Sequence, residues 1–306
     1  MTQTAKKPMR LRRSQLAVPG VSEKMLTKAA ASKADHVFCD LEDAVAPSAK
    51  AGARETIVEA LNHLDWGDTV RCVRVNDIGT PWCHEDIITV VEKAGKNIDT
   101  IMLPKPLNAS DVQFADTLLT QLEMKLGLEH KIGLEVLIEE VEAMQNVAEI
   151  ATSCERLECM IFGMGDYAAS QGLVMKNIGD TQGYPGDIFH YPRYQMTIAA
   201  RAAGLDAVDG PFVDFNNIDA YKIECQRSLM LGMVGKWAIH PAQIEPALDI
   251  FSPSQEDVDF AREVIAVYEK AAAEGLGSVG HKGVMVDAAS ARLFQNTVNR
   301  ADLIGM

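Results

Sequence analysis

Three side chains with metal-binding and anion-binding chemistry stand far apart in the chain: Arg74, Glu139 and Asp166. Each comes at the end of, or just after, a short apolar run of the kind that forms a β-strand. Two carboxylates suit a hard divalent cation such as Mg²⁺, whose remaining ligands are water and substrate oxygens. An arginine beside them can hold a substrate carboxylate through two parallel hydrogen bonds. Together the three residues predict a site that binds a metal ion and an anion.

Each of these residues also has a purely structural interpretation. A single acid at a strand end is often a helix N-cap or a solvated carboxylate. Arg74 lies within a strand-like run, and a buried arginine needs an acidic partner, for which Glu42 and Asp43 are candidates. The structural and functional roles of Arg74 can hold together. Zinc is disfavoured as the metal, because the sequence has neither an HExxH pattern nor paired cysteines.

The segment Gly163-Met-Gly165-Asp-Tyr-Ala168 matches the GxGxxG/A pattern of dinucleotide-binding folds. Asp166 would then lie within the phosphate cradle, where its carboxylate repels a pyrophosphate. The segment also follows five β-α units instead of opening the first one. We therefore disfavour nucleotide binding at this segment.

Polar residues follow other predicted strands as well: Asp43, Lys105, Asp209 and His240. His240, after the eighth predicted strand, is interpreted as a hydrogen-bonded structural residue and not as a base. Asp287 precedes Ala-Ala-Ser and an expected helix, which is the position of an N-cap. Position alone assigns none of these five residues a catalytic role.

The composition is that of an ordinary globular protein of 306 residues, with 47% hydrophobic and 24% charged residues. The net charge of -14 disfavours a nucleic-acid partner, but not a small anionic substrate. Six cysteines without a CxxC pair predict reduced thiols and a cytoplasmic location. Since the sequence shows no apolar signal core and no run of 18 apolar residues, we expect no membrane partner. Residues 1–13 carry five basic and no acidic side chains, which suits a frayed basic tail.

Strand-like and helix-like segments alternate along the first 250 residues. The pattern predicts strands at residues 14–18, 36–41, 69–75, 100–103, 132–138, 157–162, 205–208 and 234–239. It predicts helices at residues 22–32, 49–63, 81–94, 110–126, 140–152, 191–203 and 216–231, with Ser110 as the N-cap of the fourth. Eight β-α alternations favour a closed α/β barrel, the (β/α)8 or TIM fold, over an open doubly wound sheet. We therefore assign residues 1–250 to a barrel whose strand ends carry the metal and substrate site.

The alternation ends at Phe251, and a different pattern follows in residues 251–306. A helix is predicted at 252–273, a hairpin at 278–286 and a last helix from Asp287. Such a segment is too small to fold alone. We therefore expect a small C-terminal helical extension that packs on the barrel or on a neighbouring subunit.

Seven motifs spread along the chain resemble those of one enzyme family. They lie at residues 13–20, 40–47, 74–76, 103–105, 162–170, 209–212 and 235–241. From about Leu11 almost to the C-terminus, the sequence is similar to the malyl-CoA lyases, which belong to the citrate-lyase-β-like CoA-ester lyases of the HpcH/HpaI aldolase superfamily. The combination of motifs is specific, although no single motif is.

The resemblance implies a (β/α)8 barrel whose C-terminal extension covers the active site of a neighbouring subunit, in a homotrimer or homohexamer. It implies that Glu139 and Asp166 bind Mg²⁺, with Mn²⁺ as an alternative, and that Arg74 binds the glyoxylate end of the substrate. It also implies that Asp287, donated by the adjacent subunit, exchanges a proton with the acetyl carbon.

The resemblance further implies how coenzyme A is bound. The family lysine that reaches the CoA phosphates falls at Lys28, and Ser22 stands where the family can carry a second basic residue, which Lys24 could replace. Further implied contacts are Arg13 and Ala17 to CoA, and Gly163 and Gly165 to substrate. The stretch 172–192 is shorter than in close malyl-CoA lyases. Because this region borders the site in the family, its length bears on which acyl group is accepted.

The activity implied by the resemblance is reversible, Mg²⁺-dependent cleavage of (S)-malyl-CoA to acetyl-CoA and glyoxylate, and of β-methylmalyl-CoA to propionyl-CoA and glyoxylate. The sequence offers no obvious activated serine or cysteine, in keeping with a reaction that needs no covalent intermediate. The alternatives are a citramalyl-CoA lyase, a malyl-CoA thioesterase and, outside the enzymes, a CoA-binding assembly subunit. The presence of Arg74, Glu139, Asp166 and Asp287 together speaks against the last.

Overall fold

The computed structural model describes residues 8–175 and 186–306. They form two compact units, one made mainly of Arg12–Leu248 and the other of Asp249–Met306 with Met9–Leu11. The predicted tail residues Lys6 and Lys7 and the middle of the stretch 172–192 lie outside the described residues. None of the helices in the described part of the chain combines the length and the apolar composition that crossing a bilayer requires.

Eight parallel strands close into a barrel in the first unit, as predicted. They are β1 (Ser14–Pro19), β2 (His36–Asp40), β3 (Val70–Arg74), β4 (Thr100–Leu103), β5 (Gly133–Ile138), β6 (Leu157–Phe162), β7 (Asp206–Asp209) and β8 (Gly235–Ala238). The strands pair in sequence order, and β1 pairs with β8 to close the sheet. The alternative of an open sheet is therefore wrong, because β1 and β8 would then both be edge strands.

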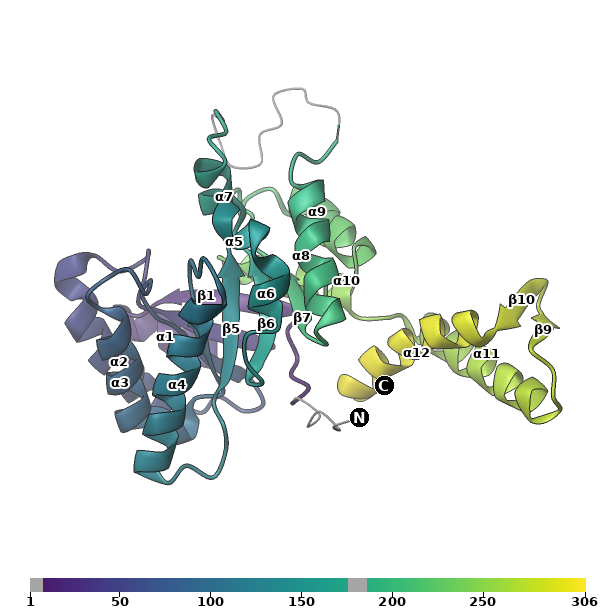
Figure 1. The fold of residues 1–306 in the computed structure, drawn as a ribbon, viewed down its shortest axis with the longest axis horizontal. Coiled ribbons are helices and arrows are strands. Elements are labelled where there is room, and N and C mark those ends of the chain that lie inside the picture. The colour runs from purple at the N-terminus through teal and green to yellow at the C-terminus, as the bar shows by residue number, and fades with distance from the viewer. Residues whose placement is uncertain (1–7, 176–185) are drawn as a thin grey trace. The chain divides into compact units, whose positions relative to one another are not determined.

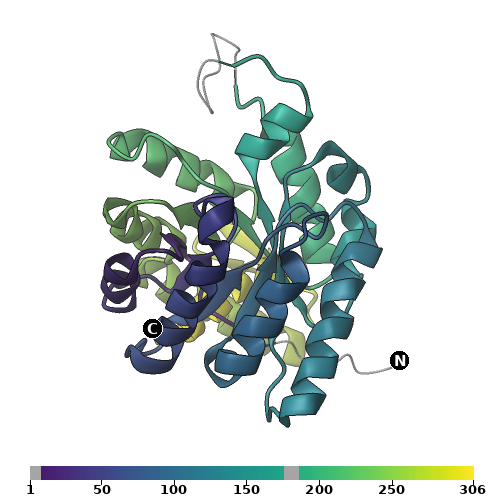
Figure 2. The ribbon, with the colours of Figure 1, turned by 90° about the vertical axis from the view of Figure 1, so that its left-hand side faces the viewer.

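Helices connect the strands and lie on the outside of the barrel (Figures 1 and 2). They are α1 (Glu23–Ala30), α2 (Lys50–His63), α3 (Cys83–Ala94), α4 (Ala109–Leu126), α5 (Val141–Gln145), α6 (Val147–Ala151), α7 (Met164–Ser170), α8 (His190–Ala202), α9 (Ile218–Met230) and α10 (Ile244–Phe251), with short 3-10 turns η1 (Pro47–Ala49), η2 (Gly95–Asn97) and η3 (Pro241–Gln243). The main hydrophobic core lies between these helices and the outer faces of the strands.

Three local predictions need correction. The N-cap of α4 is Asn108 and not Ser110, since the Asn108 side chain accepts hydrogen bonds from two backbone N–H groups of the first turn. The single helix predicted at 140–152 is broken at Asn146 into α5 and α6. Asparagine tends to leave helical geometry, and here its side chain donates to the carbonyl oxygen of Leu107 at 2.8 Å. The short helices α7 and α10 were not predicted.

Side chains inside the barrel change in character along its axis. Strand residues alternate between the two faces of a sheet, so Glu135, Leu137 and Glu139 all point into the barrel. Glu135 is fully buried near the amino-terminal ends of the strands, with Arg12 and His36. The next layer is largely apolar and consists of Phe38, Cys72, Met102, Leu137, Cys159, Ile161, Val208 and Trp237. Charged side chains stand again at the carboxyl ends of the strands.

The C-terminal unit has the predicted order of helix, hairpin and helix (Figure 1). Its elements are α11 (Gln255–Ala273), β9 (Ser278–His281), β10 (Val284–Asp287) and α12 (Ala288–Leu303). The side chain of Ser254 caps α11 by accepting the backbone N–H of Asp257 at 3.1 Å. The rings of Phe260 and Phe294 meet edge to face with centroids 5.4 Å apart, which joins the two helices.

Candidate active site

Arg74 lies at the carboxyl end of β3 and is paired with acids from the end of β2. In the β2–β3 register, Asp40 stands opposite Arg74. The guanidinium donates two hydrogen bonds of 2.7 Å to the two carboxylate oxygens of Asp40. Its Nη1 lies 2.9 Å from Glu42 Oε2 and 3.7 Å from Asp43 Oδ2. The predicted partners Glu42 and Asp43 are both present, but Asp40 forms the bidentate pair.

Two aromatic rings hold the Arg74 side chain in place. Its guanidinium carbon lies 5.7 Å from the ring centroid of Phe38 and 5.5 Å from that of Trp237, within the range of cation–π attraction. Arg74 is 7% exposed. Burial alone would raise the pKa of Asp40, but the charge and hydrogen bonds of Arg74 hold it below its ordinary value. The Arg74–Asp40 pair is therefore a fixed, charged element of the site.

Glu139 directly follows β5 and is 2% exposed. The backbone N–H of Lys105, just after β4, donates to Glu139 Oε1 at 3.2 Å. Gly163, just after β6, packs against the other side, where an added Cβ atom would lie 2.5 Å from Glu139 Oε2. Any side chain at position 163 would displace the Glu139 carboxylate. Gly163 thus lies at the predicted site, and its structural role is to leave room for Glu139.

Asp166 and Gly165 lie in the first turn of α7, and the Asp166 side chain is 44% exposed. The Lys105 ammonium reaches both this carboxylate and the acids around Arg74. Its Nζ lies 3.7 Å from Asp166 Oδ1 and 2.6 Å from Glu42 Oε1. Arg74, Glu139 and Asp166 thus lie at one edge of the barrel, and Lys105 lies among them.

Negative charge exceeds positive charge at this edge, and the pKa of Glu139 reflects the excess. Burial raises that pKa well above its ordinary value, and the charges of Glu42 and Asp166 raise it further. Arg74 and Lys105 oppose the shift without cancelling it. Burial likewise raises the pKa of Glu42 to about 7, against the attraction of Arg74 and Lys105. The edge is therefore short of positive charge.

The donor atoms and the charge imbalance both fit a hard divalent cation. Mg²⁺ is held in proteins by one or two carboxylates, with water and substrate oxygens completing its shell. Glu139 and Asp166 offer such oxygens from neighbouring strand ends. A cation between them would relieve the repulsion that raises the pKa of Glu139. These two residues are the ones that could hold the metal.

A second group with ligand chemistry lies at the opposite end of the barrel interior. Atoms of His36, Cys72 and Glu135 lie within 4.8 Å of one another. Glu135, however, already interacts with Arg12 Nε, Gln15 Nε2 and His36 Nε2, each at 3.1 Å. Burial alone would raise the pKa of Glu135, but His36 and Arg12 lower it below its ordinary value. A metal ion here would meet a buried guanidinium, so we interpret this group as structural.

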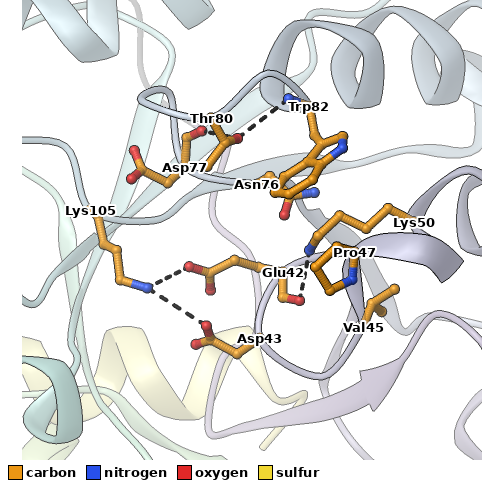
Figure 3. A pocket seen from close by; sticks show the side chains of 10 residues that line it. All are labelled: Glu42, Asp43, Val45, Pro47, Lys50, Asn76, Asp77, Thr80, Trp82 and Lys105. Atoms are coloured by element: carbon orange, nitrogen blue, oxygen red, sulfur yellow. Dashed lines mark hydrogen bonds and ion pairs between the residues drawn. The ribbon is translucent and has the colours of Figure 1, made fainter.

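A cavity of about 310 Å³ opens beside Glu42 and Lys105 (Figure 3). Its lining comes from the segments after β2, β3 and β4 and consists of Glu42, Asp43, Val45, Pro47, Lys50, Asn76, Asp77, Thr80, Trp82 and Lys105. Lys50 Nζ lies 5.0 Å from the Trp82 ring centroid and donates to the carbonyl oxygens of Leu41 and Glu42. The cavity can accept part of a ligand, or a movement of the Lys105 side chain.

The lysines expected near coenzyme A lie on one helix. Lys24 and Lys28 are both exposed on α1 and are one turn apart, so they share a face. Ser22 serves as the N-cap of α1, where its side chain accepts the backbone N–H of Met25 at 3.3 Å. Two ammonium groups on one face can bind a polyanion together.

The other two residues predicted to contact coenzyme A lie on β1 or directly before it. Arg13 precedes the strand, at the amino-terminal end of the barrel, and donates to both oxygens of Asp35 at 2.7 Å. Ala17 stands opposite Phe38 in the sheet, with its side chain toward the barrel interior. The structure thus brings Ala17, but not Arg13, toward the edge that carries Glu139.

Asp287 lies in the C-terminal unit, at the end of β10, and caps α12. Its Oδ1 accepts the backbone N–H and the hydroxyl of Ser290, each at 2.9 Å. These hydrogen bonds lower the pKa of Asp287 below its ordinary value. The N-cap interpretation is confirmed, and the role in proton transfer stays a prediction.

Two other polar residues at strand ends are structural. The ring of His240 accepts the backbone N–H of Ala242 at 3.2 Å and stacks on Phe215, as a hydrogen-bonded residue would. Asp209 is fully buried and accepts a hydrogen bond of 2.6 Å from Lys236. Their partners account for both side chains without a ligand.

Two residues of the site had no functional role in the sequence interpretation: Asp40 and Lys105. Asp40 opens the string Asp-Leu-Glu-Asp at the end of β2, and its position opposite Arg74 follows from the register of two strands. Lys105 stands between Pro104 and Pro106 and has a φ of 51°, which is unusual for a residue with a side chain. Its position after a predicted strand, between two prolines, was the available signal.

The fold and the site together define a class of protein. It is a (β/α)8-barrel enzyme whose strand ends gather carboxylates and an arginine, a set of side chains suited to a divalent metal ion and an anion. Residues 13–241 match the family model HpcH/HpaI aldolase/citrate lyase, and the chain belongs to this family. The predictions of a TIM barrel, of this family of CoA-ester lyases and of a carbon–carbon lyase are confirmed.

Individual proteins show the same relationship over nearly the whole chain. The chain is 40% identical to the L-malyl-CoA/beta-methylmalyl-CoA lyase of Rhodobacter capsulatus, with 97% of this chain and 96% of that protein covered. It is 34% identical to the (3S)-malyl-CoA thioesterase of Cereibacter sphaeroides, with 95% of each covered. Among solved structures, protein CitE of Mycobacterium tuberculosis in complex with magnesium, acetoacetate and coenzyme A has a TM-score of 0.73 and 26% identity, with 94% of this chain and 97% of that chain covered.

Proposed function

We propose that the protein cleaves (S)-malyl-CoA reversibly to acetyl-CoA and glyoxylate in a Mg²⁺-dependent reaction, and β-methylmalyl-CoA to propionyl-CoA and glyoxylate. One observation carries this proposal. Arg74, Glu139 and Asp166 meet at one edge of the barrel, in a chain that is 40% identical to a lyase named for these two esters.

Arg74 would bind the carboxylate of the glyoxylate half. Asp40 holds the Nε and Nη2 side of the guanidinium, so the substrate would meet Nη1, the side near Glu42. Asp40 and the two aromatic rings fix the plane of the guanidinium before substrate arrives, which reduces the entropy lost on binding. Arg74 would also stabilise negative charge on the neighbouring oxygen as the carbon–carbon bond breaks.

Glu139 and Asp166 would hold Mg²⁺, for which Mn²⁺ with the same oxygen ligands is an alternative. The bound ion supplies a Lewis acid for the carboxylate and hydroxyl oxygens of the substrate. Glu139 is preorganised for this role, because the backbone N–H of Lys105 and the contact with Gly163 fix its carboxylate.

Asp287 would handle the proton at the acetyl carbon. In cleavage its acid form protonates the enolate carbon, and in condensation its carboxylate removes that proton. The hydrogen bonds from Ser290 favour the carboxylate, which is the form needed for condensation. We propose that residues 251–306 carry Asp287 to the active site of a neighbouring subunit in a homotrimer or homohexamer.

Coenzyme A would bind along α1 and β1. Lys28, with Lys24 one turn away, would bind its phosphates, and Ala17 would lie beside the acyl end. Arg13 is left out of this proposal, because its guanidinium is paired with Asp35 at the other end of the strand. Six free cysteines are in keeping with a reducing compartment such as the cytoplasm.

Incubation with malyl-CoA and Mg²⁺, followed by assay of glyoxylate and acetyl-CoA, tests the proposal. We expect both products in equal amounts, and we expect their release to stop when a chelator removes the metal. Folded protein that yields glyoxylate from neither malyl-CoA nor β-methylmalyl-CoA would overturn the proposal.

A thioesterase is the second candidate, and the 34% identity to a (3S)-malyl-CoA thioesterase favours it among the alternatives. The same incubation separates the two activities, since a thioesterase yields malate and free CoA in place of glyoxylate. A citramalyl-CoA lyase would show its highest kcat/KM with citramalyl-CoA among the three esters. A CoA-binding assembly subunit would leave all three unchanged.

A further inference from the structure

The ammonium of Lys105 is a second cation, beside Arg74, among the acids of the barrel edge. Its Nζ lies 2.6 Å from Glu42 Oε1, and 3.7 Å from both Asp43 Oδ1 and Asp166 Oδ1. The charge of Glu139 acts on it as well. The ammonium therefore stands beside Asp166, one of the two candidate metal ligands, and feels the charge of the other, Glu139.

The backbone of Lys105 is strained to reach this place. Its φ of 51° lies in the left-handed region, and prolines stand on both sides. Strained residues persist where the surrounding structure fixes them, and they gather at functional sites. Here the strained residue serves both candidate metal ligands, since its N–H donates to Glu139 and its side chain approaches Asp166.

We propose that Lys105 is a positioning residue that acts as the resident counter-cation of the acid cluster. Its ammonium neutralises the carboxylates while no metal is bound, and a divalent cation on Glu139 and Asp166 displaces it toward Asp43. This inference rests on the proposed metal pair. Two cations so close to the same carboxylates repel each other.

The structure provides a place for the displaced ammonium. Lys105 lines the cavity of about 310 Å³, so its side chain can turn into that space (Figure 3). Asp43 lines the same cavity, is 57% exposed, and already lies 3.7 Å from Nζ. The backbone N–H of Lys105 continues to hold Glu139 wherever the side chain goes.

Calorimetric titration of Mg²⁺ into the full chain tests the inference without any turnover. We compare wild type with Lys105→Met, which removes the charge, and with Lys105→Arg, which keeps it. The matched control is Lys93→Met, because Lys93 Nζ makes a 2.6 Å ion pair with Glu55 on the surface. We expect Lys105→Met to bind Mg²⁺ roughly tenfold more tightly than wild type, and the other two to stay near wild type.

Thermal unfolding supplies the second readout. Without metal, Lys105→Met is expected to melt below wild type, because its carboxylates repel one another without a counter-ion. Mg²⁺ should raise its Tm by more than it raises that of wild type. A merely structural lysine would leave a deficit that Mg²⁺ does not reduce. If Lys105→Met does not fold, Lys105→Gln serves instead, since its amide can still bond to Glu42.

The outcomes separate this inference from the proposed function. Wild type that binds Mg²⁺, with Lys105→Met binding it equally or more weakly, would overturn the role of Lys105 and leave the metal site standing. Failure of wild type and all variants to bind Mg²⁺ would overturn the metal pair, and the counter-cation role with it.

Discussion

Glu135 on β5 and Glu139 directly after this strand are the same residue type, four residues apart, and both are buried inside the barrel, yet their surroundings are opposite. Glu135 interacts with Arg12, Gln15 and His36, and its pKa lies below its ordinary value. Glu139 stands among other acids, and its pKa lies well above its ordinary value. Burial therefore does not decide the role of an acid. An acid whose charge is balanced stabilises the fold, and one whose charge is not balanced is available to a ligand.

The largest expected effect is the loss of activity on removing the unbalanced acid. Glu139→Ala should lower Mg²⁺-dependent glyoxylate release by roughly 10³-fold or more, since an interaction with developing charge is lost. Metal-free stability should be unchanged or higher, because like-charge repulsion is removed. Glyoxylate assay and thermal unfolding check both parts. Normal Mg²⁺-dependent turnover in this variant would show that the metal assignment is wrong.

Removing the balanced acid should have the opposite result. Glu135→Gln leaves the buried Arg12 with one partner fewer and is expected to cost about 4 kcal/mol of unfolding free energy. Mg²⁺ affinity of the folded protein should stay near wild type. Urea denaturation alongside Glu139→Gln makes the comparison direct. Equal stability of the two variants would contradict the contrast between the two glutamates.

The pH dependence of stability should reveal the shortage of positive charge through Glu42. Its pKa rises on folding from 4.5 to about 7, so between these values only the unfolded chain releases the proton. The contribution of Glu42 is thus fully present below pH 4.5 and is lost as the pH rises toward about 7. Relative to Glu42→Gln, wild type without metal should lose up to about 3 kcal/mol across this window. Urea unfolding measures the stability of both proteins at each end of the window. An unchanged difference between wild type and Glu42→Gln would refute the pKa shift.

The smallest expected effect tests how tightly the Glu139 carboxylate is placed. The Cβ of Gly163→Ala would lie 2.5 Å from Glu139 Oε2, so one of the two must move. We expect a loss of about 1–2 kcal/mol in stability and roughly tenfold weaker Mg²⁺ binding. The control is Gly52→Ala in α2, where the added Cβ meets nothing within 4 Å and should be neutral or stabilising. Unchanged Mg²⁺ affinity in Gly163→Ala would remove Gly163 from the site.

Most of the barrel was predictable because its strands are local apolar runs interrupted by turn residues. The predictions failed where a helix begins, breaks or ends because of contacts that only the folded chain makes. Asn108 caps α4 in place of Ser110 because its side chain reaches two N–H groups at once. The helix predicted at 140–152 gave no sign of its break at Asn146. The helix α7 was hidden by Gly163 and Gly165, which weaken helix propensity, and Gly163 is needed to leave room for Glu139.

The site was predictable in its members but not in its pairings. Arg74, Glu139 and Asp166 are recognisable as polar residues at strand ends. That Asp40 forms the bidentate pair with Arg74 depends on the register between two strands, which no local pattern reveals. The sequence showed the position of Lys105 after a strand and between two prolines, but neither its left-handed backbone nor its contacts with distant acids.

The barrel can close only after β8, the last of its strands to be synthesised, has paired with β1. Trp237 Nε1 donates to Gln15 Oε1 across 222 positions of sequence, and Arg12 reaches Asp206 across 194. At roughly 5–20 residues per second, the first strand waits on the order of 10 to 40 s for its last partner. During that time an open strand edge is exposed to wrong partners. A substitution that weakens the pairing of β1 with β8 would therefore lower the yield of folded protein during synthesis before it changes catalysis.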